Sequence, residues 1–433
     1  MRTTQQKPRR SAAGAAARRK SGARTPRRKR EGRGGLGRPS NGGLGGPTIS
    51  LERLFPPTLQ QSWSNESVAE QQANIDSARE AYSRRGLVLY LGAGVSCSIG
   101  LPTWWSLIQS LTIAMMTEQV DSALAELKKL TPERIAQTKL RIQAEVQDGV
   151  GADKSILILA RSIKNHFGSR LPYEVAQALY RPLFQTGDAF FNVLTRGTTH
   201  TLDAYPPVKQ SKLFQAIVAL SRAQREVRGV QAIVNLNYDD LIEEWMRHNG
   251  IRCDTLLSGQ KPVREATLPC YHVHGVLPFH KIHDIKIDDA LGADQKAAAF
   301  ARIRPTIGNF VFSEDEYHTE YSDPYRWSNM TMINQLGRCS GLFVGLSLQD
   351  PNLRRLIDVT HRQYPDVANY AILTRNRRQN ASSRQSTLQD LFEKVETDSF
   401  KDIGVRVIWT DSYDEVPDRI REICDVDPKM VGS

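Results

Sequence analysis

The feature that most constrains the fold is a run of five apolar residues, Leu87 to Leu91, that ends abruptly at the loop Gly92–Ser96. A continuous apolar run of this length is typical of a strand that is buried on both faces, as in a parallel sheet. Helical patterns precede it at 65–85 and follow it at 104–116. The order helix, buried strand, glycine loop, helix predicts an α/β fold.

Similar strand patterns return later in the chain and alternate with helical ones. Such alternation favours an open parallel sheet with helices on both faces. Residues 117–225 are mainly helical in pattern and contain no catalytic spacing, so we predict an inserted helical subdomain there. The predicted strands lie at 230–234, 267–274, 305–313, 341–346, 369–374 and 405–410, and the clearest later helices at 239–248 and 351–363.

The first 50 residues differ in composition from the rest. Residues 1–38 contain fourteen Lys or Arg and one acid, a charge of +13, so the rest of the chain carries −2 of the net +11. A segment with so few large apolar side chains does not offset the entropy cost of ordering, so we expect a disordered basic tail at 1–50 and a folded domain at 51–427. Residues 1–38 could make a weak nucleic-acid contact; a tail without function, a transit segment or an upstream start codon remain alternatives.

The cysteines indicate a reducing compartment. There are five, they are widely spaced, and none form a Cys-x-x-Cys pair, which suits free thiols better than disulfides and excludes a four-cysteine zinc site of the usual spacing. No apolar run is long enough to cross a membrane, and we find no secretory signal. We therefore expect a cytoplasmic protein without membrane contact.

The loop Gly92-Ala93-Gly94-Val95-Ser96 follows a predicted strand, where parallel sheets bind their ligands. Its glycines would let backbone N–H groups approach a phosphate closely. Cys97 stands where the dehydrogenase fingerprint has its third glycine, and the Gly-Lys-Ser/Thr ending of a triphosphatase loop is absent. Taken alone, the loop fits a phosphate site and a tight turn without ligand equally well.

Polar residues follow the predicted strand 230–234 directly. Asn237 can donate and accept hydrogen bonds at once, which suits a ribose hydroxyl or a water molecule. Asp239 could bind sugar hydroxyls or stabilise a positive charge. We expect the neighbouring Asp240 to cap the helix that follows.

Two histidines lie near the end of the next predicted strand. Cys270, His272 and His274 share one strand face, so a metal site completed by His280 or His283 is an alternative. No acidic or cysteine partner has zinc-type spacing, and we predict no metal. His274, directly before a glycine, suits proton transfer near neutral pH, whereas His272 fits a structural role better.

A fourth segment repeats the pattern of a buried strand that ends in glycine and small polar groups. Gly345 and Ser347 follow the strand at 341–346 and could line a phosphate or ribose. Asp350 precedes Pro351 at the start of a predicted helix, so we expect it to act as the helix cap.

In this order the four segments resemble the sirtuin-like domain family. The shared pattern is Gly-Ala-Gly-Val-Ser with Gly-Leu-Pro-Thr-Trp, then Asn-Tyr-Asp-Asp, then His-Gly, then Gly-x-Ser-x-x-Asp-Pro, over roughly residues 80–410. Residues 312–317 also look like the family's acidic and aromatic segment. The resemblance implies a Rossmann-like NAD site. It places Asn237, Asp239 and His274 at catalytic positions, and it places at the dinucleotide Gly92, Ala93, Gly94, Ser96, Thr103, Trp104, Gly345 and Ser347.

The chain departs from the zinc-containing deacylases of that family. The zinc cysteines are absent, and Leu236 stands where those enzymes carry Gln beside the catalytic Asn. These departures are similar to the divergent bacterial branch, whose members hydrolyse NAD in antiviral defence. The resemblance thus implies an NAD glycohydrolase without zinc, controlled by a homo-oligomer or a partner protein. A deacylase or ADP-ribosyltransferase, and a non-catalytic NAD or ADP-ribose sensor acting through a partner, are the alternatives.

Overall fold

The computed structural model describes residues 57–126, 131–147, 156–185, 206–222, 227–262, 267–279, 310–375 and 383–424, with a few isolated positions between these ranges. The chain divides into two units, Met1–Ser50 and Leu51–Ser433. All described residues belong to the second unit. The basic tail predicted at 1–50 lies outside the described residues.

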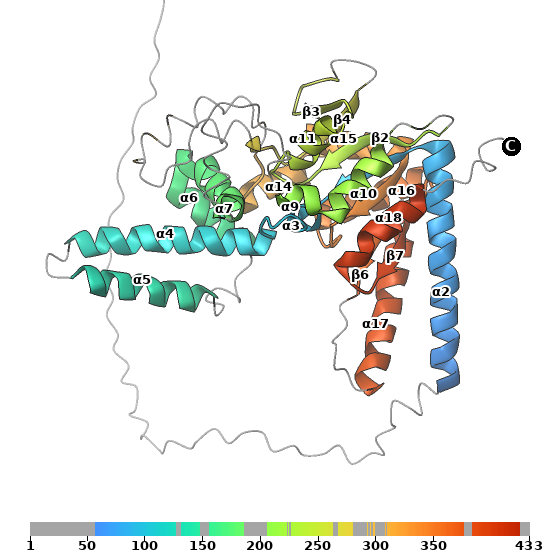
Figure 1. The fold of residues 1–433 in the computed structure, drawn as a ribbon, viewed down its shortest axis with the longest axis horizontal. Coiled ribbons are helices and arrows are strands. Elements are labelled where there is room, and N and C mark those ends of the chain that lie inside the picture. The colour runs from blue at the N-terminus through green and yellow to red at the C-terminus, as the bar shows by residue number, and fades with distance from the viewer. Residues whose placement is uncertain are drawn as a thin grey trace, which may run out of the picture. The chain divides into compact units, whose positions relative to one another are not determined.

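Seven parallel strands form one sheet at the centre of the second unit (Figure 1). Its order is β3-β4-β2-β1-β5-β6-β7, so the chain builds outward from β1 in one direction and later, from β5, in the other. The carboxyl ends of β1 and β5 therefore mark a topological switch point, the place where such sheets bind ligands. The strands are β1 (Leu87–Leu91), β2 (Val230–Asn235), β3 (Cys253–Leu256), β4 (Leu268–His272), β5 (Ser340–Val344), β6 (Asn369–Thr374) and β7 (Val405–Thr410).

The central strand β1 is buried at all five positions, as its apolar run predicts. Its side chains alternate between two cores: Leu89 packs in one, and Val88 and Tyr90 in the other. Both faces of the sheet are thus covered. The predicted α/β fold, a parallel sheet with helices on both faces, is confirmed.

Two sets of helices cover these faces. On the face of Leu89, α10 packs on α18 and α18 on α2, while α11 lies against β3. On the face of Tyr90, α15 packs on α16, and α17 on β7. The helices are α2 (Pro57–Glu80), α10 (Lys212–Ser221), α11 (Leu241–His248), α15 (Trp327–Arg338), α16 (Pro351–Gln363), α17 (Ser383–Asp402) and α18 (Val416–Cys424).

The described secondary-structure elements between β1 and β2 are all helices. Among them α4 contacts α5, α6 and α7, and α4 and α5 lie side by side (Figure 1). The predicted start of the insertion at residue 117 falls inside α4, and α10 packs beside the sheet, so the predicted limits do not coincide with helix ends. These helices are α3 (Ala93–Cys97), α4 (Trp104–Glu126), α5 (Pro132–Gln147), α6 (Ile156–Phe167), α7 (Leu171–Gln185) and α9 (Pro206–Gln210).

Short helices complete the described elements. They are η1 (Ala81–Arg85), which ends α2 as a π-helix, η2 (Gly168–Arg170), α14 (Glu314–Ser322) and η5 (Tyr413–Glu415). None of the helices within the described ranges is long and apolar enough to cross a membrane.

The segment predicted as a strand at 305–313 has no strand at its described positions, 308 and 310–313. Its backbone bonds elsewhere: the N–H of Val311 donates to the carbonyl of His274 (3.1 Å), and the hydroxyl of Tyr238 donates to the carbonyl of Val311 (2.5 Å). Its aromatic side chains pack in a cluster of rings instead, in which Phe310 stacks on Phe312. Here the apolar run therefore reflects buried side chains and not the pairing of a strand with its neighbour.

Candidate active site

The two glycines of the loop after β1 allow it to contact the end of β5. The N–H of Gly92 donates to the carbonyl of Val344 (3.0 Å), and the N–H of Gly94 to that of Gly345 (2.9 Å). A Cβ at Gly94 would lie 2.7 Å from the Cα of Gly345, too close for any other residue. These two N–H groups, expected at a phosphate, thus join the loops on either side of the switch point.

The loop after β5 is held in a conformation that few residues adopt. Gly345 has φ +68°, and a Cβ there would meet the backbone N of Val95 at 2.5 Å. Leu348 has φ 53°, which costs a residue with a Cβ about 1 kcal/mol. The carboxylate of Asp350 accepts from the N–H of Asn352 (2.7 Å) and Leu353 (3.1 Å), so its predicted role as helix cap is confirmed. Ser347 is exposed at the outer side of this loop.

Asn237, Asp239 and Ser96 form one hydrogen-bond network. The side-chain amide of Asn237 donates to the carbonyl of Gly92 (3.0 Å) and to the hydroxyl of Ser96 (3.1 Å). The Ser96 hydroxyl donates in turn to the carboxylate of Asp239 (2.6 Å). The hydroxyl thus orients both polar groups that the sequence placed at the end of β2.

Buried carboxylates follow β2. Burial raises the pKa of Asp239 to about 6 and that of Asp240 to about 7, and the nearby Glu243 adds to both shifts. The hydrogen bond from Ser96 opposes the shift at Asp239. The prediction that the Asp240 side chain caps α11 is wrong: it makes no cap bond and accepts instead from the N–H of Phe279 (2.8 Å), which ties down the chain after β4.

His274 lies beyond the end of β4, next to β2. Asn235 pairs with His272 in the ladder, so Asn237 and His274 each lie two residues past a paired position. The His274 side chain is buried, and its ring meets the ring of Tyr317 edge-on at 5.8 Å. Burial lowers its pKa, which keeps the imidazole neutral and able to accept a proton near neutral pH.

His272, for which the sequence analysis expects a structural role, has a partner at both ring nitrogens. Its Nδ1 lies 3.2 Å from the backbone carbonyl of Asn237, and its Nε2 contacts the carboxylate of Glu243. Glu243 is completely buried on α11, and the sequence analysis did not single it out. Its position on the inner face of that helix, one turn after Asp239, was the signal that could have found it.

Thr103 and Trp104 lie at the start of α4. The hydroxyl of Thr103 accepts from the N–H of Ser106 (3.1 Å), so this exposed residue caps the helix. Trp104 is half-buried and meets the rings of Tyr238 (6.2 Å) and Phe312 (5.3 Å) edge-on. Trp104 and Tyr238 thus link α4 to the loop that carries Asn237.

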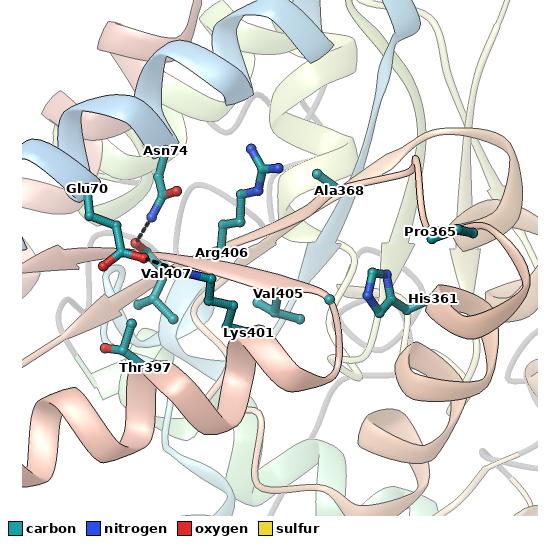
Figure 2. Close-up of a pocket in the computed structure, with 11 residues that line it drawn as sticks. Glu70, Asn74, His361, Pro365, Ala368, Thr397, Lys401, Val405, Arg406 and Val407 are labelled. Carbon is teal, nitrogen blue, oxygen red and sulfur yellow. Dashed lines mark hydrogen bonds and ion pairs between the residues drawn. The ribbon is translucent and has the colours of Figure 1, made fainter.

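One hollow of about 380 Å³ lies at the opposite end of the sheet, beside the starts of β6 and β7 (Figure 2). Figure 2 shows Asn74 donating to the carbonyl of Val407 (2.9 Å) and Lys401 next to Glu70 (3.5 Å). Parallel sheets bind their ligands at the carboxyl ends of the strands. This hollow is therefore not the site around Asn237.

One family model matches part of the chain. Residues 231–403 match the family model of the SIR2-like domain. The matched segment contains Asn237, Asp239, His274, Gly345 and Ser347, whereas the loop after β1 precedes it. No curated protein matches the chain. The match supports a sirtuin-like family and an activity that uses NAD.

Proposed function

We propose that the protein hydrolyses NAD to nicotinamide and ADP-ribose. The observation that carries this proposal is the network of Ser96, Asn237 and Asp239 at the carboxyl ends of β1 and β2, with the buried His274 at the end of the adjacent strand β4. A carboxylate, an orienting amide and a neutral imidazole thus all lie at the edge of the sheet where nucleotides bind. The matched SIR2-like segment supplies the substrate class.

The proposed reaction breaks one bond and forms one. The bond between C1′ of the ribose and the nicotinamide nitrogen breaks, and its electron pair neutralises the cationic ring. Water attacks C1′, which has oxocarbenium character, and loses a proton. The products are nicotinamide, ADP-ribose and a proton, so the site must orient the ribose, admit one water and accept the proton.

Three side chains divide this work. His274 accepts the proton, since burial keeps it neutral. Asn237 orients the ribose or the water through its amide. Asp239 binds a ribose hydroxyl or stabilises the developing positive charge, and the Ser96 hydroxyl favours its ionised form.

The diphosphate would lie beside the loops after β1 and β5. Because the N–H groups of Gly92 and Gly94 already donate to backbone carbonyls, the glycines act there by closing the two loops together. The partly exposed Ala93 and the exposed Ser347 are the positions through which the loops would contact the dinucleotide.

The test is product analysis by chromatography after purified full-length protein is incubated with NAD. We expect nicotinamide and ADP-ribose in equal amounts, and loss of both in Asn237→Ala. The control is Asn249→Ala, because Asn249 lies at the end of α11 and bonds only within that helix in the described network. O-acyl-ADP-ribose formed with an acylated peptide would instead favour a deacylase, and NAD binding without products a sensor.

The proposed biological role is antiviral defence. It rests on the resemblance to the divergent bacterial branch and on the physical point that an unregulated NAD hydrolase would drain its own cell. Control by a second copy or a partner protein is therefore part of the proposal. Phage plating on cells that express the protein or its Asn237→Ala variant tests it, and equal plaque numbers would contradict a defence role.

A further inference from the structure

Beneath the candidate active site, three side chains of metal-binding type meet in the core. One ligand atom each of Glu243, Cys270 and His272 lies within 4.8 Å of the other two. All three residues are at most 1% exposed. From this juxtaposition we propose that the cluster binds a zinc ion, in contrast to the absence of metal expected from the sequence.

The chemical types of the three ligand atoms indicate which metal would bind. A thiolate, an imidazole and a carboxylate are ligands that zinc accepts together, whereas magnesium and calcium bind oxygen donors. The donors come from two elements, Glu243 from α11 and the other two from β4. Sequence spacing could not reveal the site, because the acid lies 27 residues before Cys270 and is brought to it by the packing of the helix.

The orientation of His272 favours a metal ligand. Its Nδ1 lies 3.2 Å from the carbonyl of Asn237, so Nδ1 carries the proton and donates it. Nε2 contacts the carboxylate of Glu243, which is an acceptor, so without a metal Nε2 also carries a proton, and a metal ion bound at Nε2 would displace it. A backbone carbonyl that accepts from the second ring nitrogen is the arrangement typical of metal-binding histidines.

Glu243 supplies an independent observation. Its Oε1 contacts His272 and accepts from the thiol of Cys270 (3.2 Å), but its Oε2 is buried and has no hydrogen-bond partner within the described residues. An unsatisfied buried carboxylate oxygen is costly, and a bound cation removes that cost. Asp239 and Asp240 are buried nearby, so a divalent cation would also offset their charge.

Cys253 lies on the neighbouring strand β3, beside the cluster, but its thiol is not among the ligand atoms that meet within 4.8 Å. It pairs with Leu268 in the ladder of β3 and β4, so its side chain is on the same face as that of Cys270, two residues further along β4. Cys253 is 5% exposed, and its thiol is close enough to that of Cys270 to help raise the Cys270 pKa, which burial raises most. The cluster as it stands offers three protein ligands, and Cys253 would become a fourth, as in structural zinc sites, only by moving toward them.

Such an ion would act as a support for the active site. Through His272 it would fix the backbone of Asn237, and through Glu243 the helix that follows Asp239. Its presence does not depend on NAD turnover, so metal content and nicotinamide release test different claims.

The experiment is elemental analysis of full-length protein purified without chelators, after expression in zinc-supplemented medium. We expect about one equivalent of zinc per chain, at least about tenfold less in His272→Ala and Cys270→Ser, and a smaller loss in Cys253→Ser. Cys339→Ser is the matched control, because Cys339 is a buried thiol at the start of β5, away from the cluster. Circular dichroism shows which variants keep the fold.

A second measurement on unaltered protein covers variants that fail to fold. Protein refolded with cobalt should show a thiolate-to-cobalt charge-transfer band in the near ultraviolet, which Cys339→Ser keeps. Less than about a tenth of an equivalent of metal in the purified protein, together with no such band, would overturn the proposal and leave a hydrogen-bonded His–Glu pair. Undiminished zinc in folded Cys270→Ser would overturn it as well.

Discussion

The hydroxyl of Ser96 donates a 2.6 Å hydrogen bond to the carboxylate of Asp239, although the two residues are 143 positions apart in the sequence. The bond links the glycine loop after β1 to the polar loop after β2. It also stabilises the ionised form of a carboxyl group whose pKa burial raises to about 6. The site thus keeps a buried charge at a cost in folding free energy.

Replacing Asp239 by Asn should therefore stabilise the fold while abolishing NAD cleavage. The pKa of Asp239 is higher in the folded state than the value of about 3.9 in an unfolded chain, so folding favours the protonated form. Stability should fall as pH rises from about 4 to 6 and then stay constant, and at pH 8 the variant should gain about 3 kcal/mol. Urea unfolding of the wild type and the variant at about pH 4 and at pH 8 measures this difference in stability. A variant less stable than wild type at pH 8 would contradict the claim that the buried, ionised Asp239 costs folding free energy.

The pH profile of kcat/KM should show one acid limb. Asp239 must be ionised and His274 neutral for cleavage, and burial holds the pKa of His274 below its usual value. Activity should therefore be constant above about pH 7 and fall below the pKa of about 6 of Asp239. The exposed Asp315→Asn variant is the control and should keep the same profile. Activity that increases on acidification would rule out the assigned base.

Gly345→Ala should destabilise the fold more than a comparable glycine substitution elsewhere. Gly345 and Gly250 both have positive φ, 68° and 79°, but a Cβ would meet Val95 N at 2.5 Å only at Gly345, while nothing lies within 4 Å of it at Gly250. We expect about 1 kcal/mol for Gly250→Ala and at least about 2 kcal/mol for Gly345→Ala. Equal unfolding free energies of the two variants would show that the loops after β1 and β5 do not depend on close contact.

Tyr317→Ala should lower kcat/KM about tenfold, which corresponds to about 1.4 kcal/mol, because its ring positions His274 at 5.8 Å. Tyr317→Phe keeps the ring and should be close to wild type. Tyr321 lies on the same helix and is exposed, so Tyr321→Ala is the control. If Tyr317→Phe were as impaired as Tyr317→Ala, the hydroxyl and not the ring would be the functional group.

The sequence predicts those parts of the fold whose burial is uniform. β1 and β5 are buried at every position and were found as apolar runs. β3 was missed, since its four residues include the polar Asp254 and Thr255 and it lies at the edge of the sheet. The segment at 310–313 shows the opposite error. The sequence predicts a strand there, but its buried rings pack without pairing to a neighbouring strand.

The sequence predicts those parts of the candidate site whose position follows from the end of a strand alone. Asn237 and His274 could be placed near each other because parallel strands end at one edge. The partner of Asn237 on the loop after β1 and the contact of Glu243 with His272 were not predictable, because they depend on how α3 and α11 rotate against the sheet. For the same reason the capping role assigned to Asp240 was wrong.

The most direct test of the central claim is the rate of nicotinamide release from NAD by wild-type protein and by His274→Ala. The proposed role of His274 as base predicts release by the wild type and a loss of at least about 100-fold in the variant, with NAD binding retained in calorimetry. His318→Ala, which alters an exposed histidine, should behave as wild type. Nicotinamide release by His274→Ala at the wild-type rate would contradict it.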